Sequence, residues 1–180
     1  GSGAGNTVIR FASKDVAISV SGRSVVEDIT IEFSVKSITG KEKSGEKVAI
    51  LDNGLSNGSM IRGVSFKNVG TGFLSNADSK GAFCTTIEAV TFDNYSYKAI
   101  EIKNALSTVI RSATVGKGSS KALIPVSLGG EASIESISFV DNECEYAIEL
   151  KNASSAYLRN IVFNNTNASK GFVLCDSSRF

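Results

Sequence analysis

A pattern of alternating apolar and polar residues recurs along the chain, and this internal repeat constrains the fold more than any other feature. Its most complete copy is residues 85–104, TTIEAVTFDNYSYKAIEIKN. The first half returns as IRGVSFKN at 61–68, IESISF at 134–139 and LRNIVFN at 158–164, and more weakly at 26–31 and 110–115. The second half, AIEIKN, returns as AIELKN at 147–152. From residue 61 onward the copies begin 23 to 26 residues apart, a period typical of solenoid proteins.

Each copy predicts short strands separated by corners. In Val90-Thr91-Phe92 two apolar residues flank a polar one, which is the two-residue period of a strand. Turn-forming residues mark three corners in each coil, because small residues and asparagine tolerate tight backbone angles. The first corner holds Gly63, Ala89, Ser112, Ser136 and Asn160, the second holds Asn68, Asn94 and Asn165, and the third holds Asn53, Asn76, Asn104, Gly130, Asn152 and Asp176. The sequence therefore predicts an all-β fold, a single-stranded parallel β-helix of about six to seven coils of roughly 24 residues, with three short strands per coil.

Stacking the copies places alternating charges above one another. One position is occupied in successive copies by Glu27, Arg62, Glu88, Arg111, Glu135 and Arg159. Neighbouring side chains in a parallel coil lie about 4.8 Å apart, so alternation of sign avoids repulsion and fixes the register. We expect Arg10 to continue this ladder. An interior column is predicted at Ile31, Phe66, Phe92, Val115, Phe139 and Phe163. Beside it runs an outward hydroxyl column, which is either solvated or a contact face in an oligomer, at Thr30, Ser65, Thr91, Thr114, Ser138 and Val162.

The composition excludes several classes of chemistry. With 19 basic and 18 acidic residues the chain has no strong net field, so we expect no nucleic-acid partner. No apolar run approaches the roughly 18 residues of a membrane span, so we expect no membrane insertion. The absence of histidine excludes Ser-His-Asp and Cys-His pairs and an ordinary zinc site. Three cysteines lack metal-ligand spacing and are expected to be free thiols, with a Cys84–Cys144 disulfide as the alternative. No metal and no cofactor are expected.

The chain is interpreted as one domain. Residues 1–5 are interpreted as a vector-derived scar or linker, and residues 6–180 as the β-helix. The open ends of a solenoid expose unpaired backbone and apolar core, so we expect this chain to be a fragment of a longer one or part of an oligomer. The longest insertion, residues 34–47, carries several lysines and is expected to protrude as a solvated loop.

The repeat I-x-x-V-x-F-x-N followed by A-I-x-I-x-N resembles the rungs of right-handed parallel β-helix families. These are the pectate-lyase-like folds and the shafts of phage tailspikes and tail fibres, and the resemblance covers nearly the whole chain. It implies a right-handed coil, a polysaccharide or cell-surface glycan as partner, and an extracellular or virion-surface location. It also implies a homotrimer as a candidate assembly. The compact calcium-binding aspartate cluster of the lyases has no counterpart in this sequence.

The first functional hypothesis is non-catalytic glycan or receptor binding by side loops. Loops after the second corner, at residues 69–71, 95–98, 116–122, 143–146 and 166–170, are expected to emerge on one side of the stack and to form the site. Aromatic rings suit stacking on sugars, and carboxylates and amines suit hydrogen bonding to hydroxyl groups. The candidate carbohydrate-binding residues are Tyr95, Tyr97, Lys98, Glu143, Glu145 and Tyr146.

Two alternatives stay open. A glycoside hydrolase or lyase would use paired carboxylates, and the candidates are Glu101 with Glu149, which occupy the same rung position two coils apart, and Asp141 with Glu143. The other alternative is a bacterial adhesin or a purely structural shaft. Five Asn-x-Ser/Thr triplets would permit glycosylation of a eukaryotic secretory protein, at Asn57, Asn94, Asn152, Asn164 and Asn167.

Overall fold

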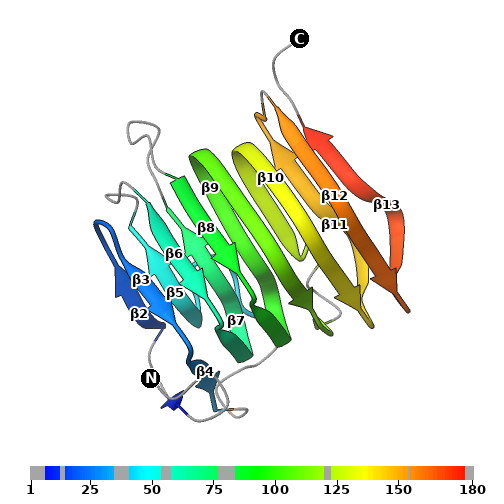
Figure 1. Cartoon of the computed structure of the whole chain (residues 1–180). Coiled ribbons are helices and arrows are strands. Elements are labelled where there is room, and N and C mark those ends of the chain that lie inside the picture. Colours follow the sequence, from blue (N-terminus) through cyan, green and yellow to red (C-terminus); the bar gives the residue numbers. More distant parts are fainter. Residues whose placement is uncertain are drawn as a thin grey trace.

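The chain folds as a parallel β-solenoid. The computed structural model describes residues 7–12, 15–34, 41–53, 58–76, 84–119, 123–153 and 155–176, and these contain strands and no helix. The strands stack into about six turns spaced about 24 residues apart, which Figure 1 shows as a continuous coil from the blue N-terminal end to the red C-terminal end. The predicted all-β parallel solenoid is thus confirmed. The proposed linker at residues 1–5 lies outside the described residues.

Three stacks of parallel strands form the walls. The first stack contains β1 (Val8–Phe11), β4 (Thr30–Phe33), the starts of β7 (Ser65–Ser75) and β9 (Thr91–Val115), and the ends of β9, β10 (Val126–Val140) and β12 (Ala156–Asn164). The second contains β2 (Val16–Val20), β5 (Val48–Asp52), the end of β7, the middle of β9, the start of β10, β11 (Glu143–Lys151) and β13 (Asn167–Asp176). The third contains β3 (Val25–Glu27), β6 (Ser59–Arg62), β8 (Cys84–Glu88), further parts of β9 and β10, and the start of β12. Strands β7, β9 and β10 run through corners, so one strand serves more than one stack.

The first and second corners have the backbone conformation that their residues predict. Left-handed φ angles between 52° and 63° occur at the first corner in six successive coils, at Asp28, Gly63, Ala89, Ser112, Ser136 and Asn160. The second corner repeats this at Asn68, Asn94, Asp141 and Asn165. A side-chain amide adds a link between coils, because Asn94 Nδ2 donates a hydrogen bond to Asn68 Oδ1 at 2.6 Å. At the third corner only Gly130 and Asn152, among the described predicted residues, have positive φ.

The charge ladder forms with the predicted register. Cα pairings connect Glu27 to Arg62, Arg62 to Glu88, Glu88 to Arg111, Arg111 to Glu135 and Glu135 to Arg159. Arg62 forms an ion pair with Glu27, and Arg111 Nε lies 3.3 Å from Glu135 Oε2. The placement of Arg10 was wrong. Arg10 pairs with Glu32 at 3.0 Å in the first stack, where Lys67 and Asp93 continue a second alternating column.

The interior is filled by the predicted apolar column. Ile31, Phe66, Phe92, Val115 and Phe139 are all buried. The rings of Phe66 and Phe92 stack at 4.7 Å between centroids with an interplanar angle of 4°. Each buried ring contributes roughly 1.5–3 kcal/mol by leaving water, so this column is a principal source of stability.

Two smaller expectations have different outcomes. All three cysteines are free, with Cys84 and Cys175 exposed and Cys144 buried, so the alternative disulfide does not form. The expectation of a solvated loop at 34–47 agrees in part with its described residues, which are Ser34 and 41–47. Ser34, Lys41 and residues 43–46 are exposed, but Glu42 is buried, and the backbone N–H of Gly70 donates a hydrogen bond to the carbonyl of Lys47. The segment 41–47 is therefore solvated along most of its length but attached to the second stack at Glu42 and Lys47.

Candidate functional site

The predicted glycan-binding residues are distributed over several places. Tyr95 is wholly buried inside the solenoid and cannot stack on a sugar ring. It pairs in register with the buried Val69, so the chain directs this side chain inward after the second corner. Tyr97 and Lys98 lie at a buried cluster on the second stack. Glu143 lies in a groove at the second corner, and Glu145 and Tyr146 follow it along β11.

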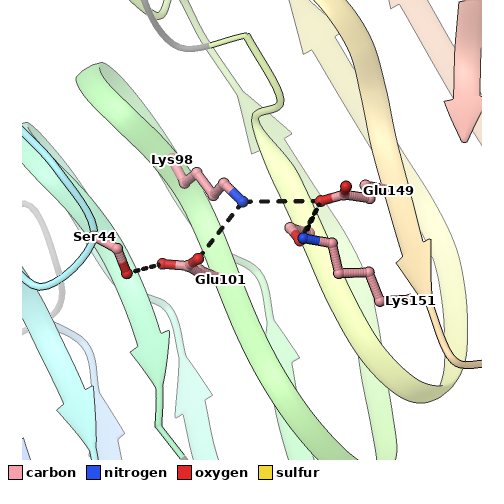
Figure 2. Close-up of polar contacts among 6 residues, drawn as sticks. Ser44, Lys98, Glu101, Glu149 and Lys151 are labelled. Carbon is pink, nitrogen blue, oxygen red and sulfur yellow. Dashed lines mark hydrogen bonds and ion pairs between the residues drawn. The ribbon is translucent and has the colours of Figure 1, made fainter. Parts of the chain in front are cut away.

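A cluster of charged and hydroxyl side chains, buried at its centre but exposed at Ser44 and half-buried at Lys151, covers the outward face of the second stack (Figure 2). We call it the buried charge cluster, and its members are Ser44, Lys98, Glu101, Ser127, Glu149 and Lys151. The strand register puts Glu101, Ser127 and Glu149 on successive coils, as the sequence predicts. Lys98, Glu101 and Glu149 retain only 6% to 8% of their accessible surface. Three ionisable groups are therefore held nearly out of water.

Mutual contacts stabilise these charges. Lys98 Nζ lies 3.6 Å from Glu101 Oε1 and 3.9 Å from Glu149 Oε2, between the two carboxylates. Lys151 Nζ lies 3.1 Å from Glu149 Oε2. Ser127 Oγ donates to Glu149 at 2.6 Å, and Ser44 Oγ donates to Glu101 at 2.7 Å. The two cations balance the two anions, and the hydroxyl groups satisfy further lone pairs.

Burial dominates the electrostatics of this cluster. It lowers the pKa of Lys98, although attraction to Glu101 and Glu149 acts in the opposite direction. Burial also raises the pKa of Tyr97, and the same two carboxylates add to that rise. The Tyr97 ring lies 5.5 Å from Lys98 Nζ, a cation–π distance, so this half-buried tyrosine screens the lysine from solvent.

The geometry of the cluster suits a structural ion-pair network better than acid–base catalysis. Because both carboxylate oxygens lie within 3.9 Å of one nitrogen, they are less than about 8 Å apart, which overlaps the roughly 6.5–9.5 Å of inverting glycosidases. Such enzymes also need one carboxyl group held protonated. Here each carboxylate contacts a cation and a hydroxyl donor, and both are almost fully covered, which leaves little room for a substrate. The contact with Ser44 attaches the segment 41–47 to the sheet.

A groove of about 840 Å³ lies at the second corner of the last coils. We call it the corner groove, and it is lined by Lys117, Gly118, Asp141, Asn142, Glu143, Phe163, Asn165, Thr166, Asn167 and Phe172. Three of the loops predicted to form a site contribute to it, those at 116–122, 143–146 and 166–170. Sequence analysis proposed Asp141 and Glu143 of these residues as site candidates, but it assigned Phe163 to the core and Asn165 to a corner.

The floor of the corner groove is fixed by buried hydrogen bonds. Asn142 Nδ2 donates to the carbonyl oxygens of Val115 at 2.9 Å and Val140 at 3.0 Å. Asn142 Oδ1 accepts a hydrogen bond from the hydroxyl group of Tyr95. A Cβ atom at Gly118 would lie 2.7 Å from Cζ of Tyr95, so only glycine permits this close approach of the loop. Tyr95 therefore supports the groove from inside.

The rim combines hydrogen-bonding groups with one exposed ring. Asn165 Nδ2 donates to Asp141 Oδ1 at 2.6 Å, and Glu143 stands opposite Asn167 in the strand register. The ring of Phe172 stacks on Phe163 at 4.1 Å and keeps 45% of its surface exposed. Carboxylates and amides thus project beside an aromatic surface.

The two remaining candidates lie outside the lining of the groove. Glu145 Oε2 pairs with Lys170 Nζ at 2.7 Å, and this contact raises the pKa of Lys170. Tyr146 is half-buried beside Gly171 of the next coil. Both side chains connect β11 to β13. Of the six predicted glycan-binding residues, only Glu143 lines the corner groove.

Comparisons with known proteins add no assignment. No protein-family model matches the chain, and no curated protein matches it. Among the described residues, histidine, cysteine and carboxylate side chains form no group of three that could hold a metal ion. The described residues also contain no helix with the length and hydropathy needed to span a bilayer.

Proposed function

We propose that this protein is an extracellular or virion-surface β-helix, similar to a segment of a phage tailspike or tail fibre, that binds a polysaccharide or cell-surface glycan in the corner groove. The groove is the observation that carries this proposal. Its volume of about 840 Å³ lies within the roughly 300–1,000 Å³ of small-ligand sites. The hydrogen-bonded floor under it is pre-organised, which lowers the entropic cost of binding.

The side chains of the groove suit a neutral sugar. Asp141 and Glu143 can accept hydrogen bonds from hydroxyl groups, and the amides of Asn165 and Asn167 can donate and accept. The exposed face of Phe172 can stack on a sugar ring. Two carboxylates face one lysine in the lining, so an anionic polysaccharide would be repelled.

Binding to a glycan array and to soluble polysaccharides tests the proposal. Glu143→Gln combined with Asn167→Ala should reduce affinity for the bound glycan at least tenfold. The matched control is Glu131→Gln, which neutralises an exposed carboxylate of the third stack and should leave binding unchanged. Phe172→Ala should also weaken binding, whereas Tyr157→Ala, which removes an exposed ring elsewhere on the last coils, should not. Equal binding by all variants, or no glycan bound by the wild type, would contradict the proposal.

A polysaccharide-degrading enzyme is the second candidate function. Its catalytic carboxylates would be Asp141 and Glu143, which line the groove, and not Glu101 and Glu149, which are covered. Its test is release of reducing ends or unsaturated products from the polysaccharide that binds. An enzyme would lose product release but keep binding in Asp141→Asn. Absence of product with every bound glycan would leave binding, or the adhesin and structural-shaft alternatives, as the function.

The homotrimer remains a separate proposal that rests on the resemblance to tailspikes. The outward hydroxyl column of the first stack is the surface proposed for that contact, and Thr91 Oγ1 already bonds to Ser65 Oγ within it at 3.1 Å. Mass in solution tests it, because a trimer of fixed size would support this assembly.

A further inference from the structure

The two ends of the solenoid present unpaired strand edges and exposed apolar side chains. Within the described part of the chain, β1, β2 and β3 pair only on the side of the next coil, and β12 and β13 pair only on the side of the preceding one. Val25 in the first coil is 62% exposed and Tyr157 in the last is 52% exposed. Val8 and Val162 are likewise exposed at opposite ends. Such edges are templates for adding another strand.

The residues exposed at one end occupy the same columns as those exposed at the other. Cα pairings lead from Val25 through β6, β8, β9 and β10 to Tyr157. A second series of Cα pairings leads from the half-buried Ile18 in β2 to the exposed Val173 in β13. Val8 and Val162 both belong to the hydroxyl column of the first stack, where every residue between them is threonine or serine. A further coil in the same register would therefore bring these apolar side chains together.

The charge ladder identifies which coil fits each end. The ladder has Glu27 at the first end and Arg159 at the last, because signs alternate over an even number of positions. A second copy stacked in the same direction places Glu27 above Arg159 and continues the alternation. A copy stacked in the opposite direction would place two arginines or two glutamates together and would repel.

We propose that copies of this protein associate head to tail, the β1–β3 edge of one copy on the β12–β13 edge of the next. The parallel hydrogen-bond pattern continues across the junction, Tyr157 packs on Val25, and Arg159 pairs with Glu27. This contact uses two different surfaces, so it does not close on itself and generates a linear series of oligomers. It differs from the homotrimer proposed above, which would use the outward hydroxyl column of the first stack.

Sedimentation velocity over a range of protein concentrations tests the proposal. The wild type should form masses that are successive multiples of the single chain, and the association should weaken with added salt. Arg159→Glu and Glu27→Arg should each lower the association constant at least tenfold. Lys103→Glu is the matched control, because it reverses an exposed charge at a distance from both ends and should leave association unchanged.

The decisive experiment mixes the two single variants. Each variant alone has like charges at its two ends, but a mixture again offers opposite charges at every junction. The mixture should therefore recover association, which also shows that both variants are folded. A wild type that stays a single chain, a fixed trimer unaffected by either variant, or a mixture without recovery would overturn the head-to-tail contact.

Discussion

Removing the cation of the buried charge cluster should destabilise the protein more than removal of any exposed lysine. In Lys98→Met the side chain keeps most of its volume, but Glu101 loses its ion pair with Lys98, whereas Glu149 keeps its ion pair with Lys151. Breaking a buried ion pair on one side costs about 3–5 kcal/mol. Because Lys151 and the two serine hydroxyls remain, we expect about 2–4 kcal/mol.

Urea denaturation of the wild type, Lys98→Met and Lys103→Met measures this cost. Lys103 lies five residues further along β9 and is exposed, so its replacement should change the free energy of unfolding by less than about 0.5 kcal/mol. Lys98→Met should also be cleaved more readily within residues 41–47 under limited proteolysis, because Ser44 in that segment donates a hydrogen bond to Glu101. Equal unfolding free energies for the two variants would refute the claim that the cluster depends on Lys98.

Three further predictions concern other parts of the molecule. Burial lowers the pKa of Lys98 in the folded protein, so between that lowered value and 10.5 the unfolded chain binds more protons at this lysine than the folded chain does. The free energy of unfolding of the wild type, relative to that of Lys98→Met, should therefore rise with pH in this window. Paired urea titrations at increasing pH measure this free-energy difference, and a difference that falls with pH would contradict the prediction. Tyr95→Phe should cost about 1–3 kcal/mol in thermal or urea unfolding, because it leaves the buried Oδ1 of Asn142 without its donor, and a neutral result would show that the floor of the groove does not need this bond. Gly130→Ala should prevent or severely weaken folding, because its Cβ would overlap the carbonyl oxygen of Ala105 and its φ is 93°. The control Gly45→Ala has a similar φ of 90° but nothing within 4 Å of its Cβ, so it carries only backbone strain of roughly 1 kcal/mol. Similar circular dichroism melts for the two variants would contradict the steric argument.

The sequence predicts the solenoid well because every coil repeats the same physical requirement. Alternating charges reveal the register, since a shift by one coil would place like charges together. The corners are predictable because left-handed angles favour asparagine and glycine, although Ala89 and Ser112 also adopt them where the repeat requires it. Arg10 was misplaced because the residues of both charged columns come directly after an apolar residue in the sequence. Only the strand pairing of Arg10 with Glu32 shows to which of the two columns it belongs.

The candidate site is less predictable because it depends on where side chains point after a corner. Tyr95 was expected on a surface loop, but the strand continues through the corner and turns the ring inward onto the Val69 column. Val69 and Tyr95 occupy the same position in successive coils, and this shared apolar position is a sequence signal that the Tyr95 ring points inward. The corner groove joins residues of β11, β12 and β13 with the connecting segments after β9, β10 and β12, and the sequence gives no signal for how those segments converge.

Disulfide trapping tests the stacking register most directly. In a background with Cys84, Cys144 and Cys175 replaced, Ser65→Cys with Thr91→Cys introduces thiols at paired positions of adjacent coils, whose hydroxyls now lie 3.1 Å apart. Ser65→Cys with Thr114→Cys is the control, two coils and about 10 Å apart, beyond the roughly 4.4–6.8 Å that a disulfide spans. The stacked-coil account predicts fast oxidation of the first pair and none of the second. Oxidation of the control pair alone, or of neither pair, would contradict it.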